Sequence, residues 1–142
     1  MGVFLMSIYK TLFMQYLNEK GVKYTDVDEF AVKISYSCDN INSVNAYVFF
    51  DKKGQGMVQL HVWNIMNYKG KREVGYVACN ELNNKYRWVK FYVDNDDDIA
   101  ADIDAYIDED TCGPECLNLV RRIVNIVDEA YPTFARYLWG NN

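Results

Sequence analysis

The segment from residue 77 to residue 108 constrains the fold most strongly, because it predicts the end of a helix followed by a complete β-hairpin. Side chains alternate between two faces on both sides of an acidic turn, as in a half-buried antiparallel pair. The predicted buried face takes Val89, Phe91, Val93, Ile99, Ala101 and Ile103, and the opposite face takes Trp88, Lys90, Tyr92, Asp102, Asp104 and Tyr106. This register pairs Val93 with Ile99 and Lys90 with Asp102.

The first half of the chain predicts one helix and three strands. Helical spacing relates Leu5, Ile8, Tyr9, Leu12, Tyr16 and Leu17, and Gly21 follows as a stop signal. Alternation over 32–36, 44–50 and 58–62 then predicts strands, and the two glycines of 51–56 indicate a turn. These strands form a predicted meander.

Two further helices flank the hairpin. One spans 71–84 with the apolar stripe Val74, Val77, Ala78 and Leu82, and the other begins near Pro114 with the stripe Cys116, Val120, Ile123, Val127 and Ala130. Pro132 is expected to break or kink the last helix, since proline lacks a backbone donor. The predicted order is α-β-β-β-α-β-β-α, an α+β fold in which an antiparallel sheet packs against helices. A length of 142 residues, half of them hydrophobic, fits one domain over residues 1–142.

Charge and composition exclude several kinds of partner. The net charge is −5, and the basic clusters are no longer than 70–72 or the pair Arg121 and Arg122, so no nucleic acid is expected. The apolar start at 1–6 lacks the basic residues of a secretory signal, and no apolar run is long enough for a membrane span. We therefore expect a cytoplasmic protein without a membrane partner, whose four cysteines are reduced.

No residue pattern predicts catalysis, a cofactor or a structural metal. His61 is the single histidine, and Cys112 and Cys116 are one residue too far apart for a C-x-x-C motif. The turn 94–98 begins like a calcium loop, but Ile99 and Ala105 replace its glycine and its bidentate glutamate. A hairpin turn is the favoured interpretation, with weak cation binding left open. Asn80 and Asn83, three residues apart, are expected to satisfy backbone groups where the helix meets the strand.

The helix end 80–83, the aromatic strand 87–94, the acidic turn and the alternating return strand together resemble the YbjN family of bacterial proteins. That family is similar in fold to the chaperones of type III secretion, which are small acidic α+β proteins, commonly dimeric, that hold client segments. The resemblance implies a fold and an association with regulation or protein handling. It implies no catalytic residues.

The feature that most favours a function is aromatic. If the apolar strand positions form the core, one sheet face gathers Tyr47, Phe49, His61, Trp63, Trp88, Tyr92 and Tyr106. An exposed patch of this kind marks a protein contact, unless the last helix covers it. We predict a non-enzymatic protein-binding module, chaperone-like or regulatory. It contacts a client segment or forms a homodimer, and the contact surface is either this face or the terminal helix. The terminal helix carries Phe134, Tyr137, Leu138 and Trp139. The alternative is a regulatory small-ligand-binding domain.

Overall fold

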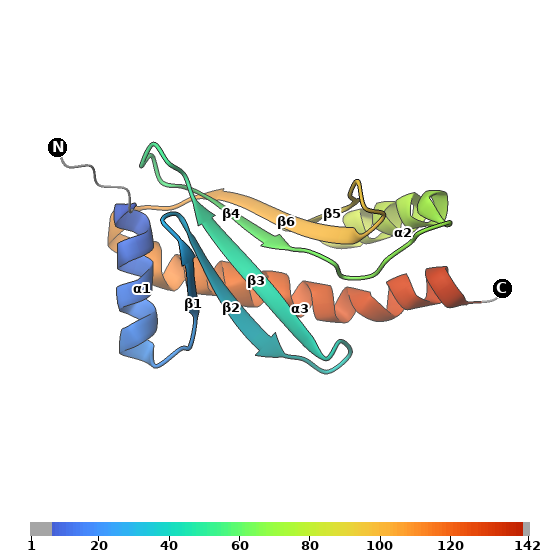
Figure 1. Ribbon diagram of the computed structural model, residues 1–142, viewed down its shortest axis with the longest axis horizontal. Helices are drawn as coiled ribbons and strands as arrows, with labels where there is room; N and C mark the ends of the chain where they lie inside the picture. The colour runs from blue at the N-terminus through green and yellow to red at the C-terminus, as the bar shows by residue number, and fades with distance from the viewer. Residues whose placement is uncertain (1–6, 141–142) are drawn as a thin grey trace.

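A computed structural model describes residues 7–140, and this part of the chain contains three α-helices and one six-stranded antiparallel sheet (Figure 1). The helices are α1 (Ile8–Lys20), α2 (Arg72–Lys85) and α3 (Cys112–Trp139), with a short 3-10 turn η1 (Glu109–Thr111) before α3. The strands are β1 (Thr25–Asp28), β2 (Ala31–Ser37), β3 (Ser43–Phe50), β4 (Met57–Val62), β5 (Lys90–Val93) and β6 (Ile99–Tyr106). The predicted α+β class is confirmed. The predictions made for 1–6, including Leu5, lie outside the described residues.

The strands follow the order β1-β2-β3-β4-β6-β5. The predicted meander is β2-β3-β4, and the predicted hairpin is β5-β6 with Val93 opposite Ile99 and Lys90 opposite Asp102, so both are confirmed. The sequence did not predict β1, which adds one strand to the expected order. All four residues of β1 are exposed, so the strand has no apolar alternation and depends on its pairing with β2.

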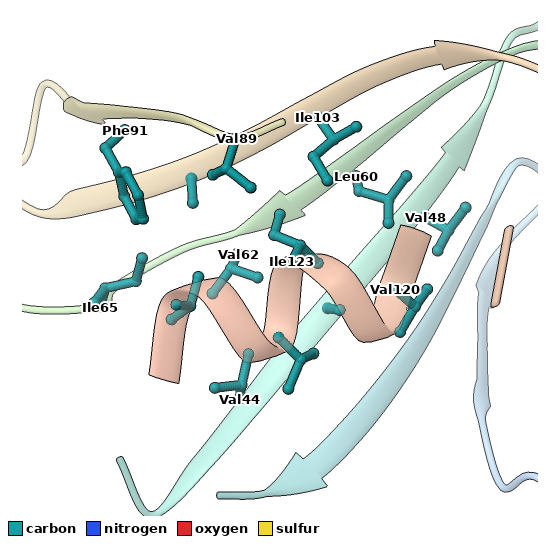
Figure 2. Packing of buried hydrophobic residues seen from close by; sticks show 14 of the residues in the cluster. Val44, Val48, Leu60, Val62, Ile65, Val89, Phe91, Ile103, Val120 and Ile123 are labelled. Atoms are coloured by element: carbon teal, nitrogen blue, oxygen red, sulfur yellow. The ribbon is translucent and has the colours of Figure 1, made fainter. Parts of the chain in front are cut away.

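The helices form one layer on one face of the sheet. Helix α3 runs along the length of the molecule, with α1 across one end and α2 at the other (Figure 1). Strand residues such as Val48, Leu60 and Ile103 point toward Val120 and Ile123 of α3 (Figure 2). This core contains the predicted inner face of the hairpin.

Helix α1 is rotated relative to the prediction. Ile8, expected in the buried stripe, is 49% exposed, whereas Phe13 is fully buried and Lys10 is 1% exposed. The Lys10 ammonium donates to a carboxylate oxygen of Asp26 and to the backbone carbonyl of Asp28, each at 2.5 Å. A buried lysine needs such partners, and both lie in β1, so the rotation could not be predicted without that strand.

Helix α2 also differs from the predicted stripe at one position. Val77 is 56% exposed, while Ala78 and Leu82 are buried as predicted. The buried face includes Gly75, where a Cβ atom would lie 3.0 Å from Val93 and 3.2 Å from the ring of Tyr68. The glycine therefore lets α2 approach β5 closely.

Of the two outcomes expected at Pro132, a break or a kink, the break does not occur, because α3 continues through the proline to Trp139. Pro132 has no N–H for the carbonyl of Asp128, four residues earlier. The side-chain amide of Asn40, in the turn between β2 and β3, donates to that carbonyl at 3.1 Å. A side chain from a distant turn thus satisfies the carbonyl that the proline leaves without a helical partner.

The Asp128 side chain binds the same turn. Its carboxylate accepts the backbone N–H groups of Asp39, Asn40 and Ile41 at 3.3, 2.8 and 2.9 Å. Burial opposes ionisation of this carboxyl, but the three N–H donors outweigh burial and lower the pKa of Asp128. The ionised carboxylate therefore holds the β2–β3 turn against α3.

This contact predicts a pH-dependent loss of stability in Asp128→Asn. Because the pKa of Asp128 is lower in the folded state, its carboxylate adds to the free energy of unfolding at pH values above the unfolded-state pKa. This stabilisation is lost as pH falls through the folded-state pKa. We expect the variant to be about 1 kcal/mol less stable than wild type near pH 7, with the difference shrinking below about pH 4. Urea unfolding across this pH range measures it. The control Asp39→Asn makes the same charge change in the turn and should leave the free energy of unfolding nearly unchanged. A loss of stability in Asp128→Asn that did not vary with pH would contradict the role of the ionised carboxylate.

Candidate functional site

The sheet face opposite the three helices is the candidate site, and we call it the outer face. The helices all contact inner-face residues: α1 meets Phe50 through Phe13, α2 meets Val93, and α3 covers the core strands. Within residues 7–140, no helix packs on the outer face. The alternative that the last helix covers the aromatic face is therefore wrong for Tyr47, Phe49, His61, Trp63 and Tyr92.

Antiparallel register places five outer-face residues in one row across the sheet. Lys33 of β2 faces Tyr47 of β3, which faces His61 of β4; His61 faces Asp102 of β6, which faces Lys90 of β5. The Cβ atoms of directly opposed residues on neighbouring strands are about 5 Å apart. Thr25 of β1 faces Lys33 and extends this row, so the row crosses all six strands, with a lysine on either side of a ring-bearing centre.

Four rings from β3, β4 and the residue after β4 form what we call the aromatic cluster, which contains Tyr47, Phe49, His61 and Trp63. The Trp63 ring centre lies 4.9 Å from that of Tyr47, 5.8 Å from that of Phe49 and 5.1 Å from that of His61. The His61 ring stacks on Trp63 at an interplanar angle of 15° and meets Phe49 edge-on at 73°. These contacts hold the rings in fixed orientations while Trp63 remains 39% exposed.

Beside the cluster, Asp102 holds both His61 and Tyr92. One carboxylate oxygen lies 2.6 Å from Nδ1 of His61 and accepts the Tyr92 hydroxyl at 3.2 Å. Burial of the phenol, together with the charge of Asp102 and its hydrogen bond, raises the pKa of Tyr92 to about 12. Lys90, the predicted charge partner of Asp102, instead lies over the Tyr92 ring at 5.2 Å. Asp102 thus orients two rings of the outer face, a role that strand alternation could not reveal.

Two members of the predicted aromatic set lie apart from the cluster. Tyr106 is on the outer face and is 75% exposed, but it is four residues further along β6 than Asp102, about 13 Å away. Trp88 precedes β5, which begins only at Lys90, so strand alternation does not extend to it. Its ring contacts the guanidinium of Arg122 on α3 at 4.7 Å, which removes it from the outer-face group.

A hollow of about 490 Å³ adjoins the aromatic cluster. Phe49, His61 and Trp63 form one side of it. The end of β1 and the turn that follows it add Asp28, Glu29 and Phe30 to its lining. This hollow could not be predicted from the sequence, because it requires β1 to fold beside β2.

The terminal helix offers less apolar surface than predicted. Phe134 and Leu138 are buried in the core, and Phe134 packs against Phe91 at 5.3 Å between ring centres. The Tyr137 hydroxyl donates to Glu81 at 2.5 Å. Of the four residues named for this surface, only Trp139 is widely exposed, at 66%.

The other candidate chemical sites have structural roles. The Asp94 carboxylate accepts the N–H groups of Asp96 and Asp98 inside the hairpin turn, as a turn residue does. Among the described residues, no cluster of three histidine, cysteine or acidic side chains could hold a metal ion. Asn83 exchanges two hydrogen bonds with the backbone of Phe91, at 2.8 and 3.0 Å, as predicted for the helix-to-strand junction, whereas Asn80 is exposed.

The cysteines are free thiols in the folded chain. Cys112 and Cys116 are buried at the start of α3, and the Cys112 thiol donates to the carbonyl of Tyr9 at 3.4 Å. Hydrogen bonding to Cys112 and burial both raise the pKa of Cys116. Burial limits access of reagents to this pair.

One helical layer against a sheet whose other face carries ordered aromatic rings defines an α+β domain of two layers. Residues 14–136 match the model of the YbjN family, described as a putative bacterial sensory transduction regulator, and the chain belongs to this family. No curated protein matches the chain. None of the helices in residues 7–140 is long and apolar enough to cross a membrane.

Proposed function

We propose that this protein is a non-catalytic protein-binding module of a bacterial regulatory pathway, chaperone-like or regulatory, that contacts its protein partner through the outer face. The family description as a transduction regulator supports a regulatory role. The single observation that carries the proposal is the aromatic cluster, whose rings are ordered by mutual contacts on a face without a covering helix among the described residues.

The composition of the outer face suits a protein contact. Trp63 and Tyr47 combine large apolar rings with polar atoms, and such residues dominate the binding energy of protein interfaces. Lys33 and Lys90 lie on either side of the rings in this row, and charged groups at such positions form the rim of an interface. The rings are already held in place, so binding orders few side chains and loses little entropy.

A second copy of the chain is the occupant that we propose first. Twofold pairing of the outer face would cover the same aromatic cluster on both subunits. Stable protein interfaces bury about 1,200 to 2,000 Å² in total, and the sheet that carries the outer face has six strands. A client segment that lies across the strands is the other protein occupant.

Removal of two aromatic rings tests this proposal. We expect wild type to have a solution mass of twice 16.6 kDa at high micromolar concentration, and Tyr47→Ala/Trp63→Ala to be a folded monomer. Light scattering coupled to size exclusion measures the mass, and circular dichroism verifies the fold. The control Trp139→Ala removes an exposed ring from the end of α3 and should remain dimeric.

A crosslinking measurement separates a second copy from a client. A photoreactive phenylalanine analogue at position 49 should crosslink to another copy of the chain in the pure protein, and the same group at position 139 should not. A monomeric wild type would contradict the homodimer. If, in addition, the probe at position 49 captured no protein from source-cell lysate, the proposed binding role of the outer face would be wrong.

The hollow beside the cluster supports a second candidate, a regulatory domain for a small ligand. Its volume of about 490 Å³ falls within the range typical of ligand sites, and it combines aromatic rings with carboxylates. A ligand there would contact His61 and Trp63 and would quench tryptophan fluorescence. Titration of metabolite mixtures against wild type and Trp63→Phe would detect such quenching.

A further inference from the structure

The exposed side of α3 carries a groove that is separate from the aromatic cluster and includes a single outer-face residue, Tyr106, in its lining. Two adjoining hollows, of about 310 and 250 Å³, share Asn118 and Arg122 and form this groove. Asn118, Arg122 and Asn125 are spaced four and three residues apart, and Arg121 is three residues after Asn118, so all four lie along one side of the helix. We call it the α3 groove.

The two arginines give the groove a local positive charge in an acidic protein. Arg72 and Arg136 form ion pairs with Asp97 and Glu81, at 2.6 and 3.7 Å. Arg121 and Arg122 are exposed, and neither forms an ion pair within the described part of the chain. Two neighbouring guanidinium groups without internal carboxylate partners favour an anionic occupant.

The other end of the groove is apolar. Trp88 is 56% exposed there, beside Leu119 and Ile107. The guanidinium of Arg122 rests on the Trp88 ring at 4.7 Å, which positions the ring and the charge relative to each other. Glu115 borders this end and repels negative charge, so an anionic group is favoured only near Arg121 and Arg122.

We propose that the α3 groove binds an extended peptide segment of a partner protein that carries an apolar side chain next to a pair of acidic residues. The apolar side chain packs on Trp88 and Leu119, and the carboxylates pair with Arg121 and Arg122. The amides of Asn118 and Asn125 are placed to bond the peptide backbone, since an amide both donates and accepts. Tryptophan and arginine are the residues most enriched at the energetic centres of protein interfaces.

The length of the groove agrees with a short segment. From Glu115 to Ile126 the helix rises about 16 Å, at about 1.5 Å per residue. An extended chain covers this distance with about five residues, at about 3.3 Å each. A nucleic acid is a poorer fit, because a polyanion needs many basic contacts and this groove offers two arginines on a chain of net charge −5.

Fluorescence anisotropy tests the proposal with two labelled decapeptides, one with leucines before glutamates and one with the reverse order. Wild type should bind at least one of them, and Arg121→Gln/Arg122→Gln should lose at least tenfold in affinity. Trp88→Ala should also weaken binding. The matched control Lys52→Gln/Lys53→Gln removes the same charge from the exposed β3–β4 turn and should bind as wild type does.

The proposal would be overturned if neither peptide bound to wild type. It would also be overturned if a peptide with glutamine in place of glutamate bound equally well, or if the lysine control lost as much affinity as the arginine variant. Tighter binding of a single-stranded DNA decamer would overturn the choice of a peptide. Failure of the outer-face proposal would leave this test unaffected, because Tyr47→Ala/Trp63→Ala does not alter the α3 groove.

Discussion

Phe91→Ala is expected to destabilise this protein by about 3 to 5 kcal/mol, the cost typical of removing a buried phenylalanine. Phe91 is 2% exposed, and its ring packs against Phe134 of α3 at 5.3 Å and against Tyr86 at 6.4 Å. Small domains are stable by only about 5 to 15 kcal/mol, so this loss removes a large fraction of the total. Urea unfolding followed by circular dichroism measures it.

Lys90→Ala is the matched control for this prediction, because it changes the preceding residue of β5 on the outer face. Lys90 is exposed and contacts the Tyr92 ring, so its loss should change the free energy of unfolding by no more than about 0.5 kcal/mol. If the two variants lost comparable stability, the assignment of the two hairpin faces would be wrong.

Gly113→Ala is expected to cost about 1 to 3 kcal/mol, because the added methyl group has no space. A Cβ atom at Gly113 would lie 2.4 Å from Cγ and 2.5 Å from Cβ of Tyr16, where α1 packs against α3. The clash involves the base of the Tyr16 side chain, which cannot move away without shifting α1. Alanine is the better helix former by about 1 kcal/mol, so a net loss would show that the clash outweighs helix propensity.

Thermal unfolding of Gly113→Ala and of Gly113→Ala/Tyr16→Ala measures this effect. The second change removes Cγ and the rest of the ring but leaves Cβ of Tyr16, so it relieves part of the clash, and the double variant should be more stable than the sum of the two single losses predicts. Asn118→Ala, at an exposed position of the same helix, controls for alanine itself. A Gly113→Ala variant as stable as wild type would contradict the close approach of α1 to α3.

The residues of the outer face were only partly predictable from local sequence patterns. Alternation along three strands predicted that Tyr47, Phe49, His61 and Tyr92 share a face, because successive strand side chains point to opposite sides. The structure agrees for these residues and adds the row that joins Tyr47 to His61. The partner of His61 was not predictable, since Asp102 is 41 residues away and reaches His61 only through the pairing of β4 with β6.

The sequence alone determined the helices, five of the six strands and the hairpin register, because each depends on apolar periodicity within a short segment. Tertiary structure decided the rest. Strand β1 exists through its pairing with β2, Lys10 is buried because β1 supplies its partners, and α3 passes Pro132 because Asn40 donates to Asp128 across 88 residues. These outcomes depend on hydrogen bonds between groups that only the folded chain brings together, and no local pattern of residues encodes them.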